Sequence, residues 1–233
     1  MKLHISANKL AEFIIKNPEQ RTNLVRKLRR EAARKKIEFP QHYMALRGPA
    51  GRFLLGGARD PHELTLLIDR MKQRVSSPWI SRDSRLTSEA AVALIKLGEG
   101  LRQLGCEFEP TPEGAKAVLQ YPEVEVSVTP NLIVHSTRNG KPLIGSMRLY
   151  VAKQHQFELG VRGAEFVATM QYKWIVDLAR HRVPDVDLCI VVECFQQRIT
   201  KAPADSRLQL EQIARGAQAF AALWYSMDGK EAA

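Results

Sequence analysis

The chain has 233 residues, 45% of them hydrophobic, and a formal net charge of +10 at pH 7. This apolar fraction supports a folded core and argues against general disorder. No apolar run reaches the roughly 18–20 residues that a membrane-spanning helix needs. The charges scattered over residues 1–15 are unlike a signal peptide. We therefore expect a folded, cytoplasmic protein that does not have a membrane as its partner.

The basic charge is the first indication of function. A sequence pI near 9.7 exceeds what solubility requires and favours a polyanionic partner. We expect that partner to be nucleic acid, with DNA favoured over RNA. A generally basic protein without such a partner is the plain alternative.

Helical patterns dominate the first part of the chain. Ser6 is expected to cap the first helix, and Gly105 to end the last one of this part. We predict helices over residues 8–16, 18–36, 60–71 and 87–104, a loop or short helices over 39–59, and a connector over 76–85.

The helix predicted over residues 18–36 carries the most specific electrostatic signal. Its apolar stripe is flanked by Arg21, Arg26, Lys27, Arg29, Arg30, Arg34, Lys35 and Lys36, offset only by Glu19 and Glu31. Solvated charged faces usually alternate in sign, so this face predicts contact with phosphates. Tyr43 and Arg47 follow it and would add stacking or phosphate contacts. A solvated charged face without a ligand is the alternative.

The pattern changes to period two at residue 123. We predict strands over residues 123–128, 132–137, 143–152 and 188–195, and helices over 164–181 and 205–226. The Asn139-Gly140 pair predicts a hairpin turn. A strand–helix–strand step crosses over right-handed, so the strand at 188–195 should lie parallel to a neighbour. We expect residues 123–195 to form one sheet.

The expected fold class is therefore α+β or α/β. A basic helical region over residues 1–80 should precede a domain over residues 81–233 that holds a small mixed sheet flanked by helices.

The order of elements and two short motifs resemble the core of the PD-(D/E)xK nucleases. The motifs are Pro130-Asn131-Leu132-Ile133-Val134 and, after the turn, the strand from Gly145 to Lys153. The resemblance covers roughly residues 85–225. More narrowly, the chain looks like an uncharacterised proteobacterial group often carried on mobile elements. The resemblance implies a restriction-endonuclease-like domain with a role in a mobile element or in defence.

The chain departs from that family at the metal ligands. Asn131 and Ser146 stand where the resemblance implies carboxylates, and Arg148 stands where it implies lysine. A neutral amide and a hydroxyl are poor ligands for Mg²⁺, which prefers carboxylates. We therefore expect no cofactor, and a nucleic-acid-binding accessory protein without catalysis.

Two alternatives remain open. Glu193, a carboxylate within an apolar strand, would suit an active nuclease with displaced carboxylates, and Mg²⁺ would then be the cofactor. The other interpretation of Glu193 is a solvent-exposed residue at the end of a strand. Lys153 is either a phosphate contact or an ordinary surface lysine. The third possible function is a scaffold whose basic face binds an acidic protein.

Cysteine and histidine give no sign of a metal site. Cys106, Cys189 and Cys194 form no CxxC pair, and the six histidines are scattered. Cys189 and Cys194 lie in an apolar run and are expected to be buried, reduced thiols.

Overall fold

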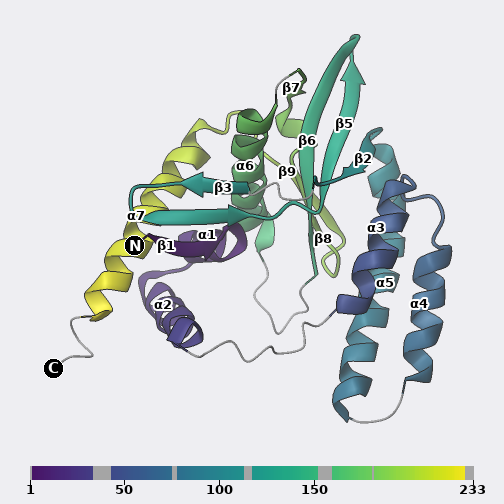
Figure 1. Cartoon of the computed structure of the whole chain (residues 1–233), viewed down its shortest axis with the longest axis horizontal. Coiled ribbons are helices and arrows are strands. Elements are labelled where there is room, and N and C mark those ends of the chain that lie inside the picture. Colours follow the sequence, from purple (N-terminus) through teal and green to yellow (C-terminus); the bar gives the residue numbers. More distant parts are fainter. Residues whose placement is uncertain are drawn as a thin grey trace.

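The structure is a computed structural model that describes residues 2–33, 43–74, 78–112, 117–151, 159–179 and 181–228. Helices cover both faces of a mixed sheet, and a smaller sheet lies beside it (Figure 1). This arrangement confirms the predicted α+β class. None of the helices in these ranges is long and apolar enough to cross a bilayer.

The larger sheet has the strand order β2-β5-β6-β8-β9. Its strands are β2 (Glu107–Pro110), β5 (Leu132–Arg138), β6 (Lys141–Tyr150), β8 (Ile190–Glu193) and β9 (Arg198–Lys201), and the short β7 (Val183–Pro184) also pairs with β6. Helix α6 (Gly160–Leu178) joins β6 to β8, which run parallel. The predicted crossover to a parallel strand is confirmed.

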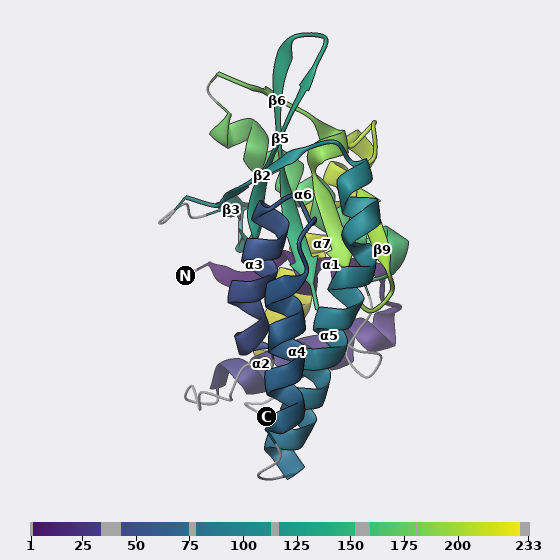
Figure 2. The same ribbon diagram turned by 90° about the vertical axis from the view of Figure 1, so that its right-hand side faces the viewer.

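The hairpin between β5 and β6 turns where the sequence predicts it. Asn139 and Gly140 have φ of 51° and 73°, as a two-residue turn with both central residues left-handed requires. The flanking residues Arg138 and Lys141 are paired. Figures 1 and 2 show the hairpin extending beyond the helices.

A second sheet corrects the expectation of one sheet over residues 123–195. β4 (Val124–Val128) lies between β1 (Leu3–Ser6) and β3 (Ala117–Gln120) in a three-stranded sheet. β1 is parallel to β4 and β3 is antiparallel to it. The alternation of buried valines in β4 identifies a half-buried strand but not its partner. Pro130, which follows β4, has no N–H to continue a ladder into β5.

The N-terminal segment belongs to the core of the C-terminal half. Ser6 caps α1 (Ala7–Ile15) by accepting the backbone N–H of Lys9 at 3.3 Å, as predicted. The Phe13 ring meets Phe220 of α7 (Arg207–Asp228) edge to face, with centroids 5.5 Å apart. α1 and α7 pack with α6 over one face of the larger sheet. The predicted helix over residues 18–36 is α2 (Pro18–Ala33) within the described residues.

Three further helices cover the opposite face, as Figure 2 shows. They are α3 (Arg47–Leu55), entered through the 3₁₀ turn η1 (Met44–Leu46), α4 (His62–Gln73) and α5 (Pro78–Gln103). The larger sheet therefore separates two hydrophobic clusters. Each cluster includes residues from both sides of the predicted domain boundary near residue 80. The predicted connector over residues 76–85 is wrong from residue 78 on, because Pro78 begins α5.

The predicted buried thiols are found. Cys189 and Cys194 are free and fully buried. Burial is the main cause that raises the pKa of each to about 12.

Gly145 of β6 marks the closest approach in the sheet. A Cβ placed there would lie 2.3 Å from the carbonyl oxygen of Leu188, in the 3₁₀ turn η2 (Val186–Leu188). Because that atom is backbone, Gly145→Ala should lower the free energy of unfolding by about 3 kcal/mol or more, at or above the upper end for overpacking. Urea denaturation measures it.

Gly51→Ala is the matched control for this substitution. Gly51 lies within α3, and nothing lies within 4 Å of a Cβ built there. Alanine should be neutral there or stabilising by about 0.5–1 kcal/mol. Equal stability of the two variants would contradict the close approach.

Candidate nucleic-acid interface

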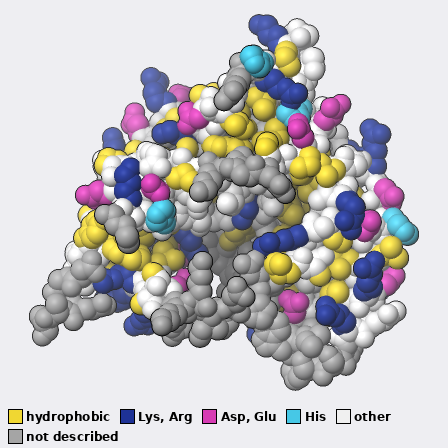
Figure 3. Space-filling view, in the orientation of Figure 1, with side chains coloured by type: hydrophobic (Ala, Val, Ile, Leu, Met, Phe, Trp, Pro, Cys, Tyr) yellow, Lys and Arg dark blue, Asp and Glu magenta, His cyan; other side chains and the backbone are white. Residues whose placement is uncertain are grey.

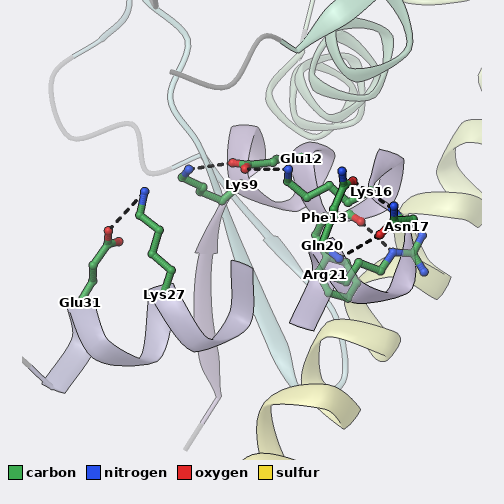
Figure 4. A network of polar contacts seen from close by, with 9 residues as sticks. All are labelled: Lys9, Glu12, Phe13, Lys16, Asn17, Gln20, Arg21, Lys27 and Glu31. Carbon is green, nitrogen blue, oxygen red and sulfur yellow. Dashed lines mark hydrogen bonds and ion pairs between the residues drawn. The ribbon is translucent and has the colours of Figure 1, made fainter. Parts of the chain in front are cut away.

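Arg21, at the start of the predicted basic face, makes hydrogen bonds within the fold. Its Nε donates to the carbonyl of Phe13 at 2.9 Å (Figure 4). Its Nη2 donates to the carbonyl of Ile14 at 2.7 Å. Its guanidinium also lies 5.1 Å from the centroid of the Phe13 ring. These are orphan carbonyls of the last turn of α1, so Arg21 caps α1 from the following helix.

Arg29 ties α2 to the C-terminal helix. Its Nη1 donates to the carbonyl of Trp224 at 3.3 Å, and its guanidinium lies 5.9 Å from the Trp224 ring centroid. Arg21 and Arg29 therefore hold α2 against α1 and α7, a role that the sequence pattern did not separate from phosphate contact.

The other described cations of α2 point to solvent. Arg26, Lys27 and Arg30 are exposed. Lys27 lies 3.9 Å from Glu31, and Arg26 donates weakly to Asn23 at 3.4 Å. Arg34, Lys35 and Lys36 lie outside the described residues. We call Arg26, Lys27 and Arg30 the α2 face.

A pocket of about 620 Å³ lies between η1–α3 and the end of the β5–β6 pair. It brings together four predicted residues, namely Tyr43, Arg47, Asn131 and Arg148. Thr129, Gly51 and an apolar group of Leu46, Ala50, Leu54, Leu132, Leu149 and Val151 complete the lining. None of the described residues that line this pocket is acidic. We call it the arginine pocket.

Arg148 reaches the arginine pocket from β6. Its Nη1 donates to the carbonyl of Thr129, and its Nε is buried with no hydrogen-bond acceptor among the described atoms. Burial lowers the pKa of Arg148, and the positive charge of Arg47 lowers it further. The pocket therefore holds a partly desolvated cation close to a second one.

Tyr43 and Arg47 form the opposite wall. Tyr43 has a left-handed backbone, with φ of 66°, and its ring centroid lies 6.3 Å from that of Phe195. Burial raises the pKa of Tyr43, and the negative charges of Glu89 and Asp83 raise it further. Arg47 is the exposed first residue of α3.

Asn131 extends the ladder between β5 and β6. Its backbone N–H donates to the carbonyl of Met147 at 2.7 Å, and its Oδ1 accepts the N–H of Leu149 at 2.8 Å. The oxygen is thereby fixed on the strand, so the NH₂ end of the amide is left for other partners. The position that the nuclease resemblance assigns to a metal ligand thus holds a structural acceptor and a spare donor.

Ser146 lies away from the arginine pocket. It is fully buried, and its hydroxyl donates to Oε1 of Gln171 on α6 at 3.4 Å. Gln171 in turn donates to the carbonyl of Ile190 at 3.1 Å. Ser146 is therefore part of a buried link between the sheet and α6.

Glu193 is fully buried, which overturns the alternative of a solvated strand end. Its Oε2 lies 2.7 Å from both Nε and Nη2 of Arg198 on β9. This ion pair, with its hydrogen bond from Nε, offsets part of the cost of burying a carboxylate. Lys153, the possible phosphate contact, lies outside the described residues.

Sequence reasoning missed a second buried carboxylate, Glu12 of α1, which is 6% exposed. It lies 2.7 Å from Lys9 and 3.6 Å from Lys16 (Figure 4). The i,i+3 and i,i+4 spacing of these three residues was the signal in the sequence. Burial is the main cause that raises the pKa of Tyr150 to about 12, and the negative charges of Glu12 and Glu193 contribute to the same shift.

Glu12 and Glu193 thus approach Tyr150 from two elements, and each has its own cation. Within the described ranges, no group of three or more His, Cys, Asp or Glu side chains could hold a metal ion.

Comparisons with protein-family models, with curated proteins and with solved structures give no match. The site is therefore interpreted from its own geometry.

Replacing Arg21 and Arg26 separately should distinguish the two kinds of cation on α2. Arg21→Gln should lower the free energy of unfolding by about 1.5–3 kcal/mol, because it removes charge-assisted bonds to two carbonyls. Arg26→Gln should change it by no more than about 0.5 kcal/mol, as at other surface sites. Urea denaturation of both variants measures this, and equal losses would contradict the division.

Tyr150 should make the fold sensitive to high pH. Its pKa is raised from 10.0 to about 12 in the folded chain, so the unfolded chain loses this proton first. The resulting stability is present below about pH 10 and falls as the pH rises toward 12. Tyr150→Phe should flatten that fall in denaturation curves taken across this range. An unchanged fall would contradict the buried environment of Tyr150.

Proposed function

We propose that this chain is a non-catalytic nucleic-acid-binding protein that contacts phosphates through the arginine pocket and the α2 face. One observation carries the proposal. Arg47 and Arg148 come from two separate elements to line one pocket, and none of its described lining residues is acidic.

The surface around the pocket supports this proposal. In Figure 3 the face in view is hollowed near its centre, and lysine and arginine side chains are visible beside the hollow. Because the chain has a net charge of +10, such a hollow should attract polyanions and raise their rate of association. DNA is the ligand we expect, because phosphate contacts supply most of the affinity of basic proteins for it.

The two surfaces would contribute differently. The exposed cations of the α2 face can neutralise phosphates and release counterions without regard to sequence. The arginine pocket is more enclosed, and its guanidinium groups can donate to a phosphate from both walls. The pocket would therefore position the nucleic acid, while the α2 face would add affinity.

A degenerate nuclease-like fold remains part of the proposal. Its support is the order α5, β2, β5, β6, α6 and β8, although β3 and β4 of the smaller sheet lie between β2 and β5 in the chain. We leave cleavage out because Asn131 and the buried Ser146 offer no carboxylate, and Arg148 is a donor and cannot bind Mg²⁺. Cleavage of DNA with Mg²⁺, abolished by Glu193→Gln, would favour the nuclease alternative.

The salt dependence of DNA binding tests the proposal. The triple variant Arg26→Gln, Lys27→Gln and Arg30→Gln should flatten the slope of log K against log salt concentration by about 2–3, at about 0.9 per phosphate contact. Fluorescence anisotropy with a short duplex measures the slope. Melting should be unchanged, since these side chains are exposed.

A matched triple variant controls for net charge. Arg70, Arg85 and Lys96 are exposed on α4 and α5, and their change to Gln removes the same charge. Equal flattening in both triples would show general attraction and no α2 contact. Absence of DNA binding, together with capture of an acidic protein, would favour the scaffold alternative.

A further inference from the structure

The guanidinium and amide groups that line the arginine pocket are donors. Arg148 carries a buried Nε–H without an acceptor among the described atoms, and Arg47 brings a second guanidinium. Leu149 holds the side-chain oxygen of Asn131, which leaves the NH₂ group of that amide to donate. A phosphate group offers only acceptors and negative charge, so it complements these donors.

The charge of the pocket points to the same ligand. Arg148 is partly desolvated, and Arg47 is close enough for its charge to lower the pKa of Arg148 further. An anion between two cations lowers the cost of holding like charges close together at reduced solvation. A bound phosphate would relieve both the desolvation and the repulsion.

The rest of the lining suits a planar apolar group. Six aliphatic residues line the pocket together with Tyr43, whose ring centroid lies 6.3 Å from that of Phe195. The volume of about 620 Å³ falls within the roughly 300–1,000 Å³ of small-molecule sites. A lone anion would use only the cationic part, whereas a phosphate with a nucleobase would use both.

The nucleobase must be unpaired to reach this wall. In a duplex each base is stacked on its neighbours, so its face is covered, whereas an unstacked base can lie against an aromatic side chain. The phosphates on the outside of a duplex could still meet the α2 face, which is open to solvent.

From these observations we infer that the arginine pocket takes one unpaired nucleotide, with its phosphate between Arg47 and Arg148 and its base against Tyr43. The inference rests on the proposed function and gives the pocket a ligand class. The nucleotide belongs to a single strand or is free in solution, since both present the same chemistry.

Binding of a fluorescent single-stranded thymidine oligonucleotide to the full chain tests this inference. Arg47→Gln and Tyr43→Leu should each weaken binding roughly tenfold, through loss of a phosphate contact or of stacking. Tyr43→Phe keeps the ring and should bind like the parent. Arg52→Gln is the matched control, because Arg52 is an exposed cation on the same helix that pairs with Glu63 at 2.8 Å and does not line the pocket.

Competitors identify the source of the nucleotide. Covalently closed, relaxed plasmid should compete weakly, because it presents few unpaired bases. Unlabelled oligonucleotide competing far more strongly than thymidine monophosphate would assign the pocket to a strand. Equal competition would assign it to free nucleotide, and both results support the inference.

Two results would overturn the inference. One is that Arg47→Gln and Tyr43→Leu bind the single strand as Arg52→Gln does, and the other is that plasmid competes as well as the oligonucleotide. If the α2 triple variant still flattens the salt slope on duplex DNA, the proposed function survives and only the pocket assignment fails. If the parent chain binds neither single strand nor duplex, both fail.

Discussion

The position of β6 in the middle of the sheet constrains the rest of the structure. It pairs with β5 on one side and with β7 and β8 on the other, and helices cover both of its faces. Successive side chains of a strand alternate between faces, so each buried residue of β6 belongs to one of two packed layers. Met147 faces α3–α5, whereas Ser146 contacts α6. Arg148 follows near the end of the strand, where it lines the arginine pocket and also a smaller cavity beside Gln171 of α6.

The point at which β5 begins explains how a cation comes to lie in a pocket. A buried arginine needs acceptors for its donors, and Arg148 finds one at the carbonyl of Thr129 because β5 begins only at Leu132. Asn131 closes the end of the ladder through Leu149. The same local geometry thus sets where β5 begins, gives Arg148 an acceptor and leaves donors facing a cavity. Where the resemblance to nucleases implies ligands for a metal, this chain has groups that suit an anion.

Much of the fold was predictable from local signals. The hairpin at Asn139-Gly140, the cap at Ser6 and the crossover to a parallel strand each depend on residues close in sequence or on the handedness of chains. β1 and β2 were missed because strands of four residues carry too little periodicity. The partner of β4 was missed because pairing depends on long-range contact. Proline at the first turn of a long helix was misread as a connector at Pro78.

The candidate site was predictable in part. The motif positions indicated Asn131 and Arg148, and the downstream segment indicated Tyr43 and Arg47, but only the fold shows that they line one pocket. On α2 the sequence could not distinguish arginines available for phosphate contact from arginines that hold the helix in the fold. Arg21 and Arg29 donate to backbone carbonyls, as does Arg102 to Ala58 at 2.8 Å. Because a carbonyl is neutral, these arginines keep their full charge and still add to the field that attracts a polyanion. Their donors, however, are occupied within the fold. Attraction at a distance therefore draws on all the cations of the chain, screened over about 8–10 Å. In the proposed function, contact with phosphates would fall to the exposed cations of the α2 face and to the arginine pocket.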